Sequence, residues 1–177
     1  MNGVKNASRL LLFPRFDIIW GLPVDYMHAI CLGVAKKLTW LWVDSSQRSR
    51  PWFVGDQVAA IDHQLQASLP ARLVKSLPRS LREKQHWKAV EYRNWLLYFA
   101  PVVLEGFLPP VYLQHLLIVV RALHVLLSNY IDTSILDIIE GNLKIFLQAF
   151  EKLYGLATLS FPLSSGSHVT SSLPPLL

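Results

Sequence analysis

The chain has 177 residues, enough for one domain with a buried core, because a chain of about 150 residues buries roughly two-thirds of its unfolded surface. Hydrophobic residues make up 52% of the sequence and the mean hydropathy is +0.32, so we expect part of the surface to be covered by a partner or to lie near a membrane. The single cysteine excludes an intramolecular disulfide and a zinc site built from several cysteines.

The net charge of +5 arises in the first part of the chain. Residues 1–100 carry 14 Lys and Arg against 7 Asp and Glu, whereas residues 101–177 carry 3 against 5. This distribution favours an anionic partner such as nucleic acid, and the alternative is a solvated basic surface.

Three regions are expected along the chain. Residues 1–12 form a short leader, which lacks the long apolar stretch and the cleavage site of a signal peptide. Residues 13–155 form a helical domain, and residues 156–177 form a Ser- and Pro-rich tail that we expect to be disordered. The longest apolar stretch, Gly106 to Val120, contains adjacent prolines and is too short to span a membrane. We expect no membrane span, and a nuclear or cytoplasmic protein that is not secreted.

The first predicted elements surround one amphipathic helix. Phe16–Trp20 lies between Pro and Gly residues and is expected to be at most a short strand. From Tyr26 apolar residues recur with a 3.6-residue period, which predicts a helix that ends near Asp44. Asp25 stands at its start, where a carboxylate can cap the first backbone N–H groups. A second helix is predicted over Trp52–Leu69.

Two longer apolar helices follow. Trp87–Leu104 has a helical pattern, with Pro101 as a kink or an end. The next helix is predicted to begin near Pro110, because proline is tolerated in a first turn, and its apolar stripe continues to Leu127.

The last predicted helix is Ser134–Tyr154, with Gly155 in a C-cap position. Its charged residues fall on one side, so the other side is expected to face the core. The residues predicted to point inward are Ile135, Ile138, Ile139, Phe146, Phe150 and Leu153.

Ligand chemistry is concentrated in Gly21–Trp42, where Asp25, His28 and Cys31 recur every three positions. Side chains at this spacing project from successive helical turns, so two of them could share a metal ion. A zinc site needs three or four protein ligands, and the remaining histidines are isolated in the sequence. The alternative is structural: Asp25 caps the helix, His28 lies near it and Cys31 packs in the core. Asp25 and His28 are therefore candidate ligands of a structural zinc ion with an incomplete ligand set.

The segment Arg72–Arg93, called here the basic segment, holds 7 basic and 2 acidic residues. Aromatic residues lie between the charges, as in surfaces that bind phosphates with cations and stack bases on rings. The alternative for Trp87 and Trp95 is a place in the core. The candidate DNA contacts are Arg72, Lys75, Arg79, Arg82, Lys84, Lys88 and Arg93.

No catalytic residue can be assigned from motifs. The sequence has no Gly-rich phosphate loop, nucleophile elbow, HExxH or paired CxxC motif, and no set of carboxylates for a two-metal site can be picked out. Glu91 lies one helical turn after Lys88, a spacing that suits a surface ion pair as well as a catalytic carboxylate.

Four blocks follow one another within about residues 13–155, namely FDIIWGLPVDYMHAICLGVAKKLTWLW, WKAVEYRNWLLYFAPVVLEGFLP, VYLQHLLIVVRALHVLLS and LKIFLQAFEKLYG. Together they resemble the transposase-like proteins of animal CACTA-type (EnSpm) DNA transposons. The resemblance implies a mainly α fold, the helical region of an RNase H-like DDE nuclease that cuts and joins DNA with carboxylates and two divalent metal ions. It also implies that Asp25 and His28 share a structural metal site with a later histidine pair, and that the basic segment faces DNA.

The family pattern is incomplete in this chain. The family's catalytic aspartates belong to an upstream segment, and its histidine pair and glutamate follow the LYG block, where this sequence continues as SFPLSSGSHVTSSLPPLL. The resemblance therefore implies a catalytically inactive transposase fragment with residual DNA binding. The alternative is a helical interaction module without enzymatic function, whose exposed apolar surface binds a protein partner or a second copy.

Overall fold

The computed structural model describes residues 25–68 and 77–155. Those after Asp25 belong to one compact unit that spans Tyr26–Phe161. Within the described ranges the regular structure is helical and includes no strand, so the expectation of a mainly α fold is confirmed. The leader, the short strand expected at Phe16–Trp20 and the Ser- and Pro-rich tail lie outside the described residues.

The first helix runs without interruption from Tyr26 to Val43. Its first part, Met27–Ala35, winds as a π-helix, and its second part is α1, Lys36–Val43. The two windings join where the backbone N–H of Lys36 donates to the carbonyl of Cys31, five residues earlier. The helix ends at Asp44, as predicted, where the backbone becomes extended.

The second helix is shorter than its sequence pattern predicted. A 3₁₀ turn at Gly55–Gln57 leads into α2, Val58–Ala67. The preceding residues are not helical, because the N–H of Val54 donates to the carbonyl of Trp42 at 2.7 Å and ties this stretch to the end of α1. The apolar residues Val58, Ile61 and Leu65 of α2 are buried, as the pattern indicated.

The third helical region changes its winding around a proline. It begins with a 3₁₀ stretch at Leu81–His86 and continues as α3, Ala89–Asn94, a π-helix at Trp95–Phe99 and α4, Ala100–Val103. Because proline has no backbone N–H, Pro101 cannot donate to the carbonyl of Leu97, four residues earlier. Nε2 of His124, on the next helix, lies 3.1 Å from that carbonyl oxygen and satisfies it.

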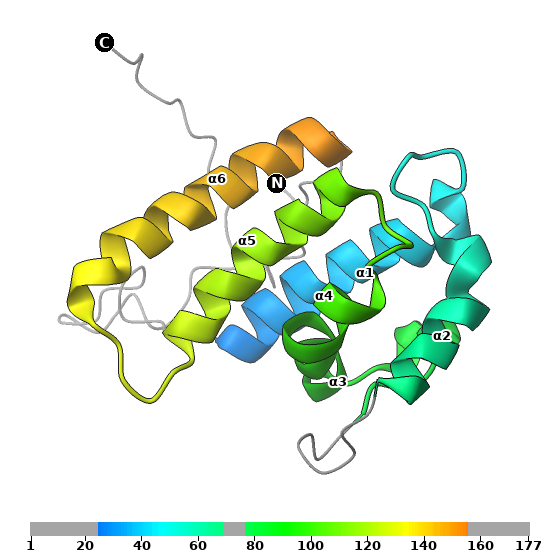
Figure 1. Ribbon diagram of the computed structural model, residues 1–177, viewed down its shortest axis with the longest axis horizontal. Coiled ribbons are helices and arrows are strands. Elements are labelled where there is room, and N and C mark those ends of the chain that lie inside the picture. Colours follow the sequence, from blue (N-terminus) through cyan, green and yellow to red (C-terminus); the bar gives the residue numbers. More distant parts are fainter. Residues whose placement is uncertain (1–24, 69–76, 156–177) are drawn as a thin grey trace, which may run out of the picture. The chain divides into compact units, whose positions relative to one another are not determined.

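The two longest α-helices that keep one winding throughout lie side by side and run in opposite directions (Figure 1). They are α5, Pro110–Leu126, and α6, Leu136–Tyr154, with a 3₁₀ turn at Thr133–Ile135 before α6. α6 ends at Gly155, whose φ of 87° is a conformation that glycine adopts more readily than other residues, so the predicted C-cap is confirmed.

Aromatic side chains connect the last described helix, α6, with α1, α5 and the loop after α1. Nε1 of Trp42, on α1, donates to the hydroxyl of Tyr154, on α6, at 3.1 Å. The ring of Trp52 lies 5.1 Å from that of Tyr154, in an edge-to-face arrangement. The imidazole of His115, on α5, stacks on Phe146 of α6 with 4.3 Å between ring centroids. These contacts attach α6 to α5 and to α1 through one face only.

None of the helices among the described residues is long and apolar enough to cross a membrane, in agreement with the sequence-based expectation.

Candidate interaction surfaces

The predicted metal ligands do not belong to a larger ligand group in the part of the chain that the structure describes. There, no three His, Cys, Asp or Glu side chains are placed to hold a metal ion. Asp25 and His28 are exposed, and Asp25 immediately precedes the first helical residue, the position expected of a cap. Cys31 is fully buried, which confirms its assignment to the core. Zinc binding by Asp25 and His28 stays a prediction.

Arg79, a predicted DNA contact, forms an ion pair inside the basic segment. Its Nε lies 2.8 Å from Oε1 of Glu91 and its Nη2 lies 2.9 Å from Oε2, a two-point contact that fixes both groups. Nη2 also donates to the carbonyl of His86. The guanidinium of Arg79 therefore joins the loop before the 3₁₀ stretch to the first turn of α3.

Glu91 is buried, with 5% of its surface exposed, so it does not form a surface pair, one of the two roles that its spacing from Lys88 left open. The backbone N–H of Lys88 donates to Oε2 of Glu91 at 2.8 Å, and Glu91 thereby caps α3. Hydrogen bonds from the Arg79 guanidinium stabilise the carboxylate and lower its pKa to about 2, despite the opposing effect of burial. Each of these contacts gives Glu91 a structural role.

Lys84 is also used within the fold. Only 14% of its side chain is exposed, and its Nζ lies 4.5 Å from the centre of the Trp40 ring and 3.8 Å from Oδ2 of Asp44. Its carbonyl accepts a hydrogen bond from the hydroxyl of Tyr92 at 2.7 Å. Lys84 thus attaches the 3₁₀ stretch to α1.

The other predicted DNA contacts are placed differently. Arg82 and Lys88 are exposed, Arg93 is half-buried, and Arg72 and Lys75 lie outside the described residues. The tryptophans predicted as possible stacking platforms are in the core, since 5% of Trp87 and 1% of Trp95 is exposed. Arg79 is also exposed, with 42% of its side chain accessible, but it is held by Glu91. Within the described part of the basic segment, Arg82 and Lys88 are therefore the exposed cations that make no ion pair.

The same segment is also held from α2, by Asp62, a residue that no motif of the sequence singled out. Oδ1 of Asp62 accepts from the backbone N–H of Leu81 at 2.9 Å, and Oδ2 accepts from the hydroxyl of Ser80 at 2.5 Å. No local spacing could have identified this cap, because Asp62 lies 18 residues before Ser80.

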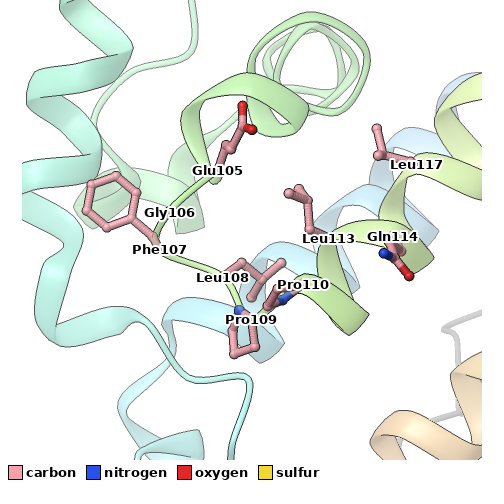
Figure 2. A pocket seen from close by; sticks show the side chains of 9 residues that line it. All are labelled: Glu105, Gly106, Phe107, Leu108, Pro109, Pro110, Leu113, Gln114 and Leu117. Atoms are coloured by element: carbon pink, nitrogen blue, oxygen red, sulfur yellow. The ribbon is translucent and has the colours of Figure 1, made fainter.

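A hollow of about 410 Å³ opens where the loop after α4 meets the first turns of α5 (Figure 2). Leu108, Leu113 and Leu117 form much of its wall, and the polar side chains at its edge are Glu105 and Gln114. Glu105 is the one ionisable side chain of this lining and has no second charged group beside it there, so the hollow offers mainly apolar contact.

α6 carries apolar side chains both on the side that packs against the core and on sides that face solvent. Phe146 and Phe150 are buried in the core, whereas 63% of Ile138 and 53% of Ile145 is exposed. The prediction that Ile138 points inward is therefore wrong, because only a narrow stripe of α6 contacts the rest of the fold. Leu136 and Leu147 are also partly exposed, at 39% and 50%.

We call one side of this helix the outer face of α6. Its members are spaced by three or four residues, so they fall on one side of the helix. They are Ile138, Gly141, Ile145, Ala149 and Lys152.

His115 shows that a histidine in this fold can be wholly structural. It is 2% exposed, and its Nε2 lies 2.9 Å from the carbonyl oxygen of Phe146. Burial among aromatic rings disfavours the charged imidazolium and lowers the pKa of His115. Neutral His115 thus joins α5 to α6.

No protein-family model, curated protein or solved structure matches this chain. The likeness to CACTA-type transposases consequently remains a prediction from the sequence blocks alone.

Proposed function

We propose that this chain is a non-catalytic helical module that binds another protein chain through the outer face of α6. The observation that carries the proposal is the exposure of Ile138 and Ile145, two large apolar side chains one heptad apart on that face. Fully burying an isoleucine side chain contributes about 1.5–3 kcal/mol, so a partner that covers both residues gains appreciable free energy.

The proposal can be tested by placing a photo-crosslinking amino acid at position 145 of the full chain. Irradiation should give adducts with a second polypeptide, because a bound partner would lie against Ile145. The matched control carries the same crosslinker in place of Leu147, which is 50% exposed, points to nearly the opposite side of α6 because it lies two residues after Ile145, and should give far less adduct. Absence of any interchain adduct from position 145, in purified protein and in cells that express it, would refute the proposal.

A second proposal is that the basic segment binds DNA without cleaving it, as a catalytically inactive fragment of a transposase would. It is supported by the exposure of Arg82 and Lys88, which both lie in the sequence between Arg79 and its ion-pair partner Glu91. Because Arg79 and Lys84 are engaged within the fold, Arg82 and Lys88 are the cations of the described segment best placed to contact phosphates.

Fluorescence anisotropy with a labelled duplex over a salt series tests this second proposal. Removing one cation that binds a phosphate should reduce the slope of log affinity against log salt by about 0.9, so a variant with both Arg82→Gln and Lys88→Gln should have a slope smaller by about two units. Arg48→Gln is the control, because Arg48 is paired with Asp56 outside the segment. Binding with the wild-type salt slope in the double variant would argue against this surface.

A further inference from the structure

We infer that the partner of the outer face of α6 is a second copy of this chain, with the two α6 helices antiparallel around a two-fold axis at Ile145. This inference rests on the proposed function and names its partner. In a two-fold pair the same surface contacts itself, so residues equally distant from Ile145 face each other across the axis. Gly141 then faces Ala149, and Ile138 faces Lys152.

Gly141 is the first observation in favour of such a pair. A glycine in the middle of a helix costs about 1 kcal/mol relative to alanine. Within the described residues no contact requires it, since a Cβ at Gly141 would have no atom within 4 Å. Opposite Ala149, however, the missing side chain lets two helix backbones approach closely. A contact between copies therefore gives Gly141 a role that the single chain does not.

The charges on α6 agree with the antiparallel direction. Its first turn contains Asp137 and its last turn contains Lys152. In the antiparallel pair, Lys152 of each copy lies beside Asp137 of the partner subunit, so two opposite-charge contacts form. The aliphatic part of the lysine covers Ile138 at the same place. A parallel pair would instead place the two Lys152 ammonium groups together, and the two Asp137 carboxylates as well.

Lys144 carries the charge closest to the two-fold axis, and this charge is already paired within its own helix. Lys144 would approach its equivalent in the second copy, but its Nζ lies 2.6 Å from Oε1 of Glu140 one turn earlier in its own helix. This pair limits repulsion across the axis. The interface is built from one helix of each copy, so we expect a dimer that forms reversibly and depends on protein concentration.

Sedimentation equilibrium of the full chain over a wide range of concentrations tests the inference. The mass should rise from 20.2 kDa toward twice that value as the concentration increases. Asp137→Lys alone, or Lys152→Asp alone, should weaken the dimer about tenfold, since each change affects both symmetric contacts. The variant with both changes should return to wild-type affinity, because the opposite charges are restored with their places exchanged.

Substitution of Gly141 provides a second, independent test of the dimer. Gly141→Leu should abolish dimerisation while circular dichroism shows unchanged helix content, since a Cβ at this position meets no atom within 4 Å in the single chain. Leu136→Ala, at an exposed position outside the outer face, is the control and should leave the dimer affinity unchanged.

The outcomes separate this inference from the proposed function. A chain that stays monomeric at all concentrations, while position 145 still crosslinks to a different protein, overturns the inference and leaves the function intact. A crosslink within one chain, between position 145 and another segment of the same molecule, overturns both. A dimer that is indifferent to the charge exchange and to Gly141→Leu also overturns the inference.

Discussion

The basic segment and the outer face of α6 differ in which kinds of side chain they bury and which they expose. In the basic segment, charged groups are drawn into the fold: Arg79 holds the buried carboxylate of Glu91, and Lys84 lies over Trp40. On α6 the reverse is found, and Ile138 and Ile145 face solvent. Charge therefore stabilises the single chain in one region, while apolar surface is left for a partner in the other.

The role of each region, stabilising the single chain or binding a partner, follows from what its side chains contact. A guanidinium bound at two points by a buried carboxylate cannot leave for a phosphate without disturbing the fold. An isoleucine that is more than half exposed contributes little to the stability of the single chain, so its removal should change binding more than folding.

The contrast within α6 is tested by two neighbouring residues. Phe146→Ala should lower the free energy of unfolding by about 4 kcal/mol, because a large buried ring leaves a cavity. Ile145→Ala should change it by less than about 0.5 kcal/mol at concentrations where the chain is monomeric, because that side chain is half exposed. Urea unfolding followed by circular dichroism measures both values. Equal decreases would mean that the outer face is part of the core.

In the basic segment the matched pair is Glu91 and Glu83, two carboxylates that both approach Arg79. Glu91→Ala should cost about 2 kcal/mol, since it removes hydrogen bonds to charged groups in a buried site. Glu83→Ala should cost less than about 0.5 kcal/mol, because its carboxylate is exposed and lies 3.8 Å from the guanidinium. The same urea experiment gives both numbers, and a reversed order would show that Glu91 is not the structural partner.

The ion pair also predicts how stability depends on pH. The Glu91 carboxyl has a pKa of about 2 in the folded chain and 4.5 as an ordinary glutamate. Between these values the unfolded chain binds a proton that the folded chain does not, so this contribution to stability is complete above pH 4.5 and is lost as the pH falls toward 2. Comparing urea midpoints of the wild type and Glu91→Gln across this window isolates the effect. Identical pH profiles would contradict the assignment.

At Gly141 a modest gain in stability is expected. In the monomer, Gly141→Ala should raise the free energy of unfolding by up to about 1 kcal/mol, because alanine favours the helix and its Cβ enters open space. Thermal unfolding at low protein concentration checks the sign. A decrease in stability would mean that Gly141 is packed closely within the single chain, and would remove one argument for the dimer.

The sequence predicted most helices because their apolar residues keep a 3.6-residue period. The helix from Tyr26 to Asp44 and the helix capped by Gly155 were placed within a residue or two of their observed ends. The π-helices before α1 and α4 were not predicted, since a helix whose hydrogen bonds join residues five positions apart has no distinct apolar pattern. Trp52 was assigned to a helix, but its role as an aromatic anchor against Tyr154 depends on a contact distant in sequence.

The candidate surfaces were harder to predict than the helices. The sequence identified the basic segment, yet the spacing of Lys88 and Glu91 suggested a surface pair, and the true partner of Glu91 is a guanidinium 12 residues away. On α6, periodicity separates apolar from charged sides but cannot show how wide a stripe its neighbours cover. Ile138 therefore looked like a core residue, and its exposure became known only from the packing of α5 against α6.

Disulfide trapping shows whether two copies meet through the outer face of α6. Ile145→Cys places one thiol of each copy at the two-fold axis, and the native Cys31 is fully buried and should not interfere. We predict that mild oxidation links Ile145→Cys rapidly into a dimer of twice 20.2 kDa, whereas Ile138→Cys reacts slowly because it faces Lys152 of the partner subunit. Equal rates for the two variants, or no linked dimer from Ile145→Cys, would contradict the account.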